Sequence, residues 1–231
     1  MESNLYIFGN GEIAEMSKYY FENDSKYSIK AFVVDDEYFD SDLFLGKPTL
    51  RWSEFQGLAA KSPVNMHIAL SYKGMNSQRH RVFTKVSNTK GIKLCSYISS
   101  RSYLAKDVAV GENVFILEGQ VIQNRVSVGH NVMLWSGNHI GHGTRIGEST
   151  YISSHVVISG HTKIGSRCFF GVNSSTRDFV NVGNDCFIAM SASVLNDMPN
   201  SSALMPFQSP LFEGEKALRI MQRATSGEIR E

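Results

Sequence analysis

Residues 122–147 read IQNRVSVGHNVMLWSGNHIGHGTRIG, and every sixth residue of this stretch is apolar: Ile122, Val128, Leu134, Ile140 and Ile146. The same spacing continues from Ile98 to Val194 without a change of register, and sixteen of its seventeen positions are apolar. A hexapeptide period is typical of a parallel β-helix, whereas six-residue spacing does not keep side chains on one face of an α-helix. The sequence therefore predicts a β-helical prism over residues 96–200.

Three hexapeptides make one coil, so inward side chains that are three repeats apart are expected to stack on each other. Two such stacks are Ile122, Ile140 and Ile158, and Ile116, Leu134 and Ile152. Each buried side chain is worth about 1.5–3 kcal/mol, and a coil cannot bury its inner face without its neighbours. Cys168 and Cys186 are also three repeats apart, which predicts small core side chains rather than a metal pair.

Glycine often follows the inward residue, for example at Gly147 and Gly165. Either an unusual backbone conformation at a corner or a close approach of two backbones would explain this preference. The sequence leaves both explanations open.

Composition limits the classes of function. The chain has 231 residues, which predicts one or two domains, and 19% of them are charged, with a net charge of +1. This balance is not typical of a nucleic-acid-binding protein. No signal peptide and no apolar run of membrane-spanning length occur, so we expect a soluble cytoplasmic protein without membrane insertion. Three cysteines indicate no disulfide framework.

Residues 1–95 follow a different pattern, in which apolar runs at 5–8, 27–34, 65–70 and 91–97 alternate with helical stretches at 12–22 and 76–87. Such alternation predicts a small, doubly wound parallel sheet. Ligands bind such sheets beyond the carboxyl ends of the strands. Three loops should meet there: the turn Gly9-Asn10-Gly11, the pair Asp35-Asp36, and Ser71.

The turn at Gly9–Gly11 lacks the third glycine of a dinucleotide-binding fingerprint, so an NAD site is not favoured. A helix N-terminus attracts anions, which favours a cradle for the phosphates of a sugar nucleotide. Glu12 stands at this terminus and could accept hydrogen bonds from sugar hydroxyls or from a base.

Five of the seven histidines lie in the stretch 130–161, at His130, His139, His142, His155 and His161. The coil length places His142 and His161 side by side. Imidazole is a suitable proton acceptor for an amine or hydroxyl that attacks a thioester. Corner histidines bonded to backbone carbonyls, and a metal shared at a trimer interface, are the alternatives; we expect no metal.

Taken together, these residues resemble the left-handed β-helix (hexapeptide-repeat) sugar acyltransferases, in the branch of nucleotide-amino-sugar N-acetyltransferases and sialic-acid O-acetyltransferase-like proteins. The resemblance implies a mainly β fold: a small Rossmann-like α/β domain (1–95) that binds a nucleotide sugar, a left-handed β-helix (96–200), and a tail with a short helix (201–231). It also implies homotrimers with acetyl-CoA in the groove between prisms. A left-handed coil departs from the usual right-handed crossover.

The resemblance also assigns roles to residues. The catalytic base falls on His142, and the carboxylate that follows this histidine in the family is replaced here by Gly143. Asn138, His139 or His161 could orient or assist His142 instead. Substrate contacts fall on Asn10, Gly11, Glu12, Asp35, Asp36 and Ser71, and acetyl-CoA contacts fall on Tyr151, Val172 and Met190.

The expected function is N-acetylation of a nucleotide-linked amino sugar for a bacterial surface glycan, by direct attack on acetyl-CoA with a histidine base. Three alternatives remain at this stage: a sugar or sialic-acid O-acetyltransferase, a non-catalytic trimeric sugar-binding scaffold, and a metal-dependent hydratase. The nucleotide and the sugar are left open.

Overall fold

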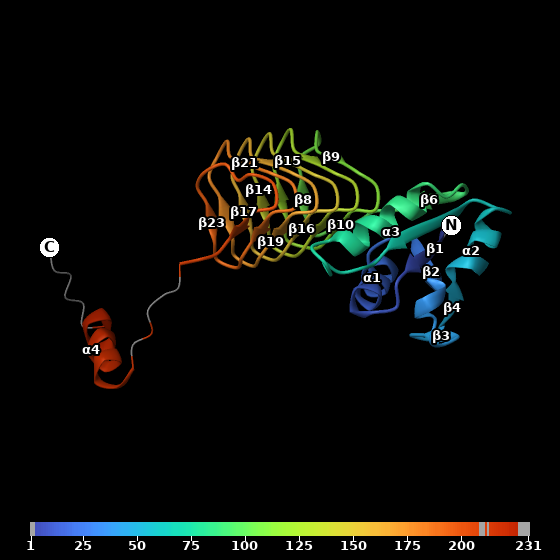
Figure 1. Cartoon of the computed structure of the whole chain (residues 1–231), viewed down its shortest axis with the longest axis horizontal. Coiled ribbons are helices and arrows are strands. Elements are labelled where there is room, and N and C mark those ends of the chain that lie inside the picture. The colour runs from blue at the N-terminus through green and yellow to red at the C-terminus, as the bar shows by residue number, and fades with distance from the viewer. Residues whose placement is uncertain (1–2, 208–210, 212, 226–231) are drawn as a thin grey trace.

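The computed structural model describes residues 3–207, 211 and 213–225, except for the side chains of 223–225. Figure 1 shows an α/β unit at the N-terminal end, a long prism beside it, and a single helix beyond the far end of the prism. Part of the predicted tail, residues 208–210, 212 and 226–231, lies outside the described residues. No helix among those described is long and apolar enough to cross a membrane.

The α/β unit is built on a six-stranded sheet with the order β3-β4-β2-β1-β5-β6, in which all pairings except β3–β4 are parallel. The strands are β1 (Ser3–Phe8), β2 (Tyr27–Val34), β3 (Leu43–Phe44), β4 (Lys47–Arg51), β5 (Val64–Ile68) and β6 (Ile92–Leu94). The helices are α1 (Glu12–Asn23), η1 (Asp36–Tyr38), α2 (Trp52–Ala59) and α3 (Ser77–Ser87).

The chain begins in the middle of this sheet at β1, builds β2 and β4 on one side, and then crosses to β5 and β6 on the other side. The strand order therefore reverses between β1 and β5, which is where doubly wound sheets bind ligands. The predicted parallel sheet is confirmed. Strands β3 and β4 and helix α2 were missed, because no clear period marks residues 37–63.

The prism has three flat faces. The first face holds β7 (Tyr97–Ile98), β10 (Phe115–Ile116), β13 (Met133–Leu134), β16 (Tyr151–Ile152), β19 (Phe169–Phe170), β22 (Phe187–Ile188) and β24 (Ala203–Leu204). The second holds β8 (Tyr103–Leu104), β11 (Val121–Ile122), β14 (His139–Ile140), β17 (Val157–Ile158), β20 (Ser175–Thr176) and β23 (Ser193–Val194). The third holds β9 (Ala109–Val110), β12 (Ser127–Val128), β15 (Arg145–Ile146), β18 (Lys163–Ile164) and β21 (Asn181–Val182).

The register along the prism is the predicted one. Met133 pairs with Phe115 on one side and with Tyr151 on the other, three repeats away in each direction. All six residues of the two predicted stacks are fully buried, as are Cys168 and Cys186. Ile98 is an exception and is 40% exposed, because its strand is the first of its face and has no coil beneath it. The fold is thus a left-handed parallel β-helix next to a small α/β unit.

The glycines after inward residues are explained by close approach. A β-carbon on Gly147 would lie 2.4 Å from the carbonyl carbon of Gly165 in the next coil, and Gly147 does not adopt a positive φ. In the repeats from Asn113 to Ser191, the left-handed conformation falls two residues later, for example at Asn131 and His161, both with φ of 57°. Successive backbones therefore come too close for any side chain at these glycines.

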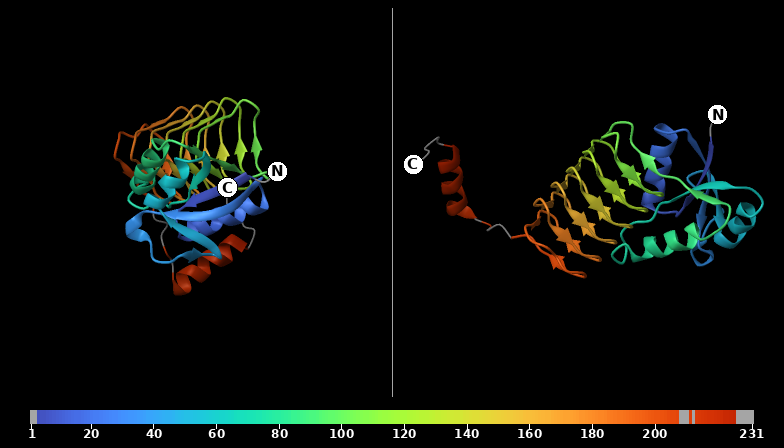
Figure 2. Two further views of the ribbon diagram at one scale, coloured as in Figure 1. Left: turned by 90° about the vertical axis from the view of Figure 1, so that its right-hand side faces the viewer. Right: turned by 90° about the horizontal axis from the view of Figure 1, so that it is seen from above.

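The α/β unit and the prism share one apolar core, in which Phe21 of α1 packs on Tyr97 and Phe115 of the first face. Figure 2 shows α1 and α3 lying against the near end of the prism. Asp24, at the end of α1, accepts hydrogen bonds from the Tyr97 hydroxyl at 2.8 Å and the Ser100 backbone N–H at 2.9 Å. Both contacts fasten α1 to the first coil.

Arg79 of α3 is completely buried and connects the two units. Its guanidinium donates to the backbone carbonyls of Asn131 and Ser149 and to the side chain of Asn76. Asn131 and Ser149 occupy equivalent positions in successive coils and their side chains are hydrogen-bonded, so Arg79 joins these two coils. Burial lowers the pKa of Arg79, and neutral carbonyls rather than a carboxylate receive its charge.

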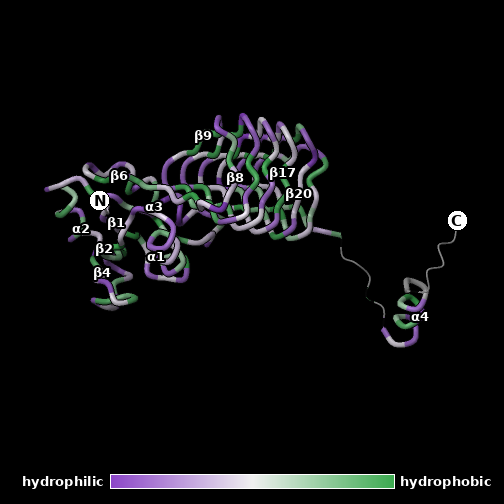
Figure 3. The backbone as a smooth tube through the Cα atoms, turned by 180° about the vertical axis from the view of Figure 1, so that it is seen from behind, coloured by the Kyte–Doolittle hydropathy of each residue, from purple (hydrophilic) through white to green (hydrophobic). Residues whose placement is uncertain are grey.

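Helix α4 (Gly214–Thr225) lies beyond the last coil. Leu218 and Met221 are 58% and 62% exposed, while Lys216 and Arg219 supply charge. Figure 3 shows polar and apolar segments alternating along the prism and within this helix. The predicted short C-terminal helix is thus present.

Candidate functional site

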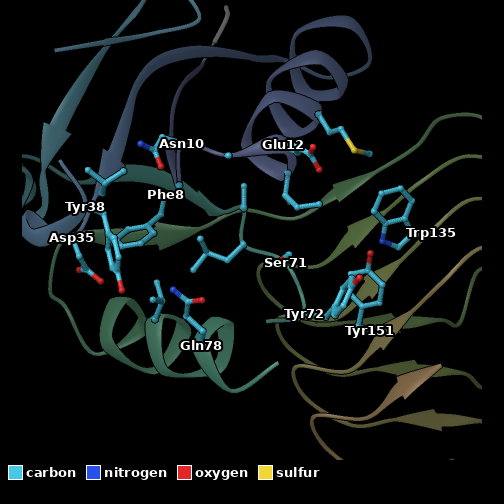
Figure 4. A pocket seen from close by; sticks show the side chains of 18 residues that line it. Phe8, Asn10, Glu12, Asp35, Tyr38, Ser71, Tyr72, Gln78, Trp135 and Tyr151 are labelled. Atoms are coloured by element: carbon cyan, nitrogen blue, oxygen red, sulfur yellow. The ribbon is translucent and has the colours of Figure 1, made fainter. Parts of the chain in front are cut away.

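A cavity of about 640 Å³ opens where the α/β unit meets the first face of the prism. Its walls come from the loops after β1, β2 and β5, from α3, and from Trp135 and Tyr151 of the prism (Figure 4). Five of the six predicted substrate residues line it: Asn10, Gly11, Glu12, Asp35 and Ser71. The three predicted loops therefore meet at one site.

The glycine turn brings the start of α1 to the cavity. Gly9 has φ of 123°, and a β-carbon there would lie 2.7 Å from the carbonyl oxygen of Ala69, so a side chain would separate β1 from β5. Gly11 is the N-cap of α1, and its carbonyl accepts from the backbone N–H groups of Ala14 and Glu15. Residues 11–13 of this helix start line the cavity, where the helix dipole favours a negative group.

Asp35 and Asp36 have different roles. The Asp35 carboxylate lines the cavity and forms an ion pair with Lys85, whose ammonium lies 4.7 Å and 4.4 Å from the ring centroids of Phe8 and Trp52. Asp36 does not line the cavity, and its carboxylate accepts the backbone N–H of Ser53 at 3.1 Å. Hydrogen bonding from Ser53, first from its side chain and then from its backbone, lowers the pKa of Asp36. Asp36 thus holds the first turn of α2 and does not face the cavity.

The cavity wall opposite the loops after β1 and β2 is aromatic. Tyr72 packs on Tyr151 with 5.0 Å between ring centroids, and Trp135 lies 6.0 Å from Tyr151. The indole N–H of Trp135 points toward the Tyr151 hydroxyl (Figure 4). Burial raises the pKa of Tyr151 above its usual value, so this hydroxyl remains protonated and can donate to a ligand.

The structure does not bring together the three predicted acetyl-CoA contacts. Val172 and Met190 lie in adjacent coils at the corner between the first and second faces, where they are 40% and 62% exposed. Tyr151 is 4% exposed and lies in the cavity wall instead. The sequence could not show this, because the face of the prism that the α/β unit covers is not encoded in the repeat.

The expected contact between His142 and His161 is present, with ring centroids 4.8 Å apart and the planes at 86°. His161 in turn stacks on Phe179, with centroids 4.9 Å apart. Gln123, which sequence reasoning missed, contacts His142: its side-chain oxygen lies 2.9 Å from the His142 backbone nitrogen and 3.1 Å from Nδ1.

The other polar candidates lie elsewhere. Asn138 is buried and bonds the backbone of Trp135 and Val156, so it stabilises the prism. His139 is on β14, and its ring makes no hydrogen bond or ring contact with His142 among the described residues. His130 accepts from the Glu112 backbone and stacks near Phe83. The sequence cluster is therefore spread around the prism, and His142 with His161 forms a local pair.

A sequence signal for Gln123 does exist. The position directly after the inward residue is usually small, as at Gly129, Gly141 and Gly147. Five large residues are exceptions to this rule: Leu117, Gln123, Trp135, Arg177 and Leu195. The structure places Gln123 beside His142 and Trp135 in the cavity wall.

The cavity and His142 lie on different sides of one prism. The cavity adjoins the first face, whereas His142 follows β14 and precedes β15, at the corner between the second and third faces. Among the described residues, those that line the cavity include no histidine. The part of the chain that the structure describes contains no group of three His, Cys, Asp or Glu side chains placed to hold a metal.

Comparison with known proteins identifies the repeat and the fold. The model of the bacterial transferase hexapeptide, six repeats, matches residues 125–160. No curated protein sequence matches the chain.

Solved structures match nearly the whole length. PerB from Caulobacter crescentus, in complex with CoA and GDP-perosamine, has a TM-score of 0.77 at 21% identity, covering 87% of this chain and 93% of that one. A mutant of the perosamine N-acetyltransferase from Caulobacter crescentus, with the same ligands, has a TM-score of 0.78 at 19% identity, covering 90% and 98%. The acetyltransferase domain of PglB from Neisseria gonorrhoeae, in complex with acetyl coenzyme A, has a TM-score of 0.60 at 16% identity, covering 90% and 100%.

These matches extend over both units of the chain, the α/β unit as well as the prism. The chain carries the hexapeptide repeat of bacterial transferases over residues 125–160, and it shares its fold with the PerB structures and with the acetyltransferase domain of PglB.

Proposed function

We propose that the protein is an acetyl-CoA-dependent N-acetyltransferase that acts on the amino group of a nucleotide-linked amino sugar. The cavity carries this proposal, because the start of α1 and the aromatic wall of Trp135 and Tyr151 line one space. A nucleoside diphosphate suits the anion-attracting end, and the apolar face of a sugar ring suits the aromatic end. The ligands in the PerB and PglB structures, CoA with GDP-perosamine and acetyl coenzyme A, support the same substrates.

We further propose that the active unit is a homotrimer, in which His142 of one protomer faces the cavity of its neighbour. The separation of the cavity from His142 within one prism supports this arrangement. Acetyl-CoA would lie in the groove between two prisms, along the exposed corner that carries Val172 and Met190. Tyr151 is reassigned from this groove to the sugar end of the cavity.

The chemistry requires a single proton acceptor. The neutral amine of the sugar attacks the thioester carbonyl carbon, and His142 accepts the proton that the nitrogen loses. The tetrahedral intermediate then breaks its carbon–sulfur bond, and the departing thiolate takes the proton back from His142. An amide and free CoA result, without a covalent enzyme intermediate. Holding two large ligands in register supplies much of the rate, as expected for a direct transfer.

Because acetyl-CoA and nucleotide sugars are cytoplasmic metabolites, we propose that the reaction takes place in the bacterial cytoplasm. An N-acetylated amino sugar linked to a nucleotide is an activated donor, so the product would enter the synthesis of a surface glycan.

The test is acetyl transfer by the purified protein with a panel of UDP-, dTDP- and GDP-linked amino sugars. We expect release of CoA thiol and an acetylated product that resists hydroxylamine, since an amide survives this treatment and an ester does not. His142→Ala should reduce kcat by about 10²–10⁴-fold. Lys30→Ala is the control, because Lys30 is exposed on β2 and lies neither in the cavity lining nor at the corner that carries Val172 and Met190. Absence of thiol release with every acceptor, or a His142→Ala rate within tenfold of the wild type, would overturn the proposal.

A further inference from the structure

One oxygen atom holds His142 from two directions. The side-chain oxygen of Gln123 lies 2.9 Å from the backbone nitrogen of His142 and 3.1 Å from its Nδ1. The backbone N–H can only donate a hydrogen bond, so the Gln123 atom that faces it must be the amide oxygen rather than the amide nitrogen. This contact determines the orientation of the Gln123 amide.

The orientation of the amide in turn determines the tautomer of His142. An amide oxygen can only accept, so Nδ1 must carry a proton to bond with it. The other ring nitrogen, Nε2, then holds the lone pair. Among the described residues, Gln123 is the side chain that hydrogen-bonds the His142 ring, while His161 contacts the ring through its edge.

The fold makes this arrangement rigid. Gln123 is half-buried and follows the inward residue Ile122, and its backbone N–H donates to the Ile140 carbonyl at 3.0 Å in the ladder between coils. His142 follows Ile140 in the next coil. Neighbouring rungs of the same prism thus fix the two backbones, so little backbone freedom is lost when the side chains meet.

We propose that Gln123 is a positioning residue that keeps neutral His142 in the tautomer with Nε2 free to accept the proton of the amine. This inference rests on the proposed role of His142 as the base. In the family that the sequence resembles, a carboxylate directly after the histidine has this orienting task. Here we assign the task to the neutral amide of Gln123, one coil away. Gly143 cannot perform this task, because it has no side chain.

The tautomer can be measured without any substrate. Two-bond proton–nitrogen NMR spectra of ¹⁵N-histidine-labelled protein distinguish a protonated Nδ1 from a protonated Nε2, and His142→Gln identifies the signals of His142. We expect Nδ1–H in the wild type at a pH where the ring is neutral. Gln123→Met keeps the length of the side chain but removes the acceptor, so Nε2–H should appear. Gln123→Glu retains an acceptor oxygen and should retain Nδ1–H.

Kinetics supply the second measurement. Gln123→Met should lower kcat by about 10–100-fold, by analogy with the cost of losing the hydrogen-bond partner of a metal-binding histidine. KM for both substrates should stay within about twofold of the wild type, since Gln123 touches neither substrate in this scheme. Gln123→Glu should recover most of kcat on the plateau of its pH profile. Gln56→Met is the control, because Gln56 is exposed on α2.

The outcomes separate the two proposals. Nε2–H in the wild type, or an unchanged tautomer in Gln123→Met, would overturn the positioning role. So would unchanged kcat in Gln123→Met when His142→Ala is inactive. The expected tautomers in a protein that transfers no acetyl group would support the positioning of His142 by Gln123 and reject acetyl transfer. A fall in melting temperature in Gln123→Met with Nδ1–H retained would indicate a purely structural role.

Discussion

A β-carbon placed on Gly143 would lie 2.7 Å from Nδ1 of His161, so the ring of His161 occupies the space that a side chain on Gly143 would need. Gly143 also has φ of 68°, a conformation in which L side chains are strained. The glycine after His142 and the histidine one coil later are thus a compatible pair. A carboxylate at position 143 is incompatible with His161 in its present position.

This relationship predicts coupling between the two positions. Gly143→Asp alone should destabilise the protein by about 1–3 kcal/mol, because the new side chain meets the His161 ring. His161→Ala should recover part of that loss in the Gly143→Asp background while giving no gain in the wild type, with a coupling energy of about 0.5–3 kcal/mol. Urea unfolding of the four proteins measures the cycle. Strictly additive effects would contradict the steric explanation.

Arg79 predicts a large stability effect at a residue outside the cavity. Arg79→Ala should cost about 3 kcal/mol, since it leaves two buried carbonyls without donors and opens a void between α3 and the prism. Arg79→Met fills the space but cannot donate, so it separates the two contributions. Arg81→Ala is the matched control, because Arg81 is exposed on the same helix. Equal unfolding midpoints for Arg79→Ala and Arg81→Ala would exclude a connecting role.

Asp24 predicts a specific acid dependence of stability. Hydrogen bonds from Ser100 and then Tyr97 lower the pKa of Asp24 from 3.8 to about 2. The unfolded chain therefore binds more protons between these two values, so the contribution of Asp24 to stability is complete above about pH 4 and is lost as the pH falls toward 2.

Asp24→Asn should be less stable than the wild type at pH 5, and the difference in urea midpoint should shrink as the pH approaches 2. Asp40→Asn, at an exposed residue of the loop after η1, should track the wild type at every pH. A constant difference between Asp24→Asn and the wild type from pH 5 to pH 2 would refute the linkage.

The two ends of the cavity predict different binding defects. Trp135→Ala should weaken the binding of a nucleotide-linked amino sugar by about tenfold, or roughly 1.4 kcal/mol. The affinity for the free nucleoside diphosphate should not change. Asn10→Ala, directly before the start of α1, should weaken the binding of both ligands. Titration calorimetry measures both, with Tyr103→Ala as an exposed aromatic control on the prism. A loss of nucleoside diphosphate binding in Trp135→Ala would place the nucleotide at the aromatic end instead.

The prism was predictable residue by residue because its inward side chains obey one strict period, and Ile140 needs no other information to be placed. The cavity residues Asn10, Asp35 and Ser71 were predictable because the loops after parallel strands meet at one edge. Asp36 differs because its partner, Ser53, lies in a stretch with no readable period.

The partner of His142 was harder to predict for a geometric reason. Gln123 and His142 are separated by one coil plus one residue, so the three-repeat rule does not pair them. The face that the α/β unit covers depends on the packing of α1 and α3 rather than on the repeat. The place of Tyr151 in the cavity therefore required the three-dimensional structure.

The length of the coil also limits which changes in length the gene can tolerate. From Ile98 to Val194 each coil has 18 residues, whereas the last turn is shorter and Ile188 pairs with Leu204 after 16 residues. Within the 18-residue coils, loss or gain of a single residue would turn every later inward side chain toward solvent, so selection should eliminate such changes there. Duplication of a whole coil after Phe170 would preserve the interior and leave His142 and the cavity untouched. Homologues are therefore expected to differ in prism length by complete coils, added at the end remote from the α/β unit.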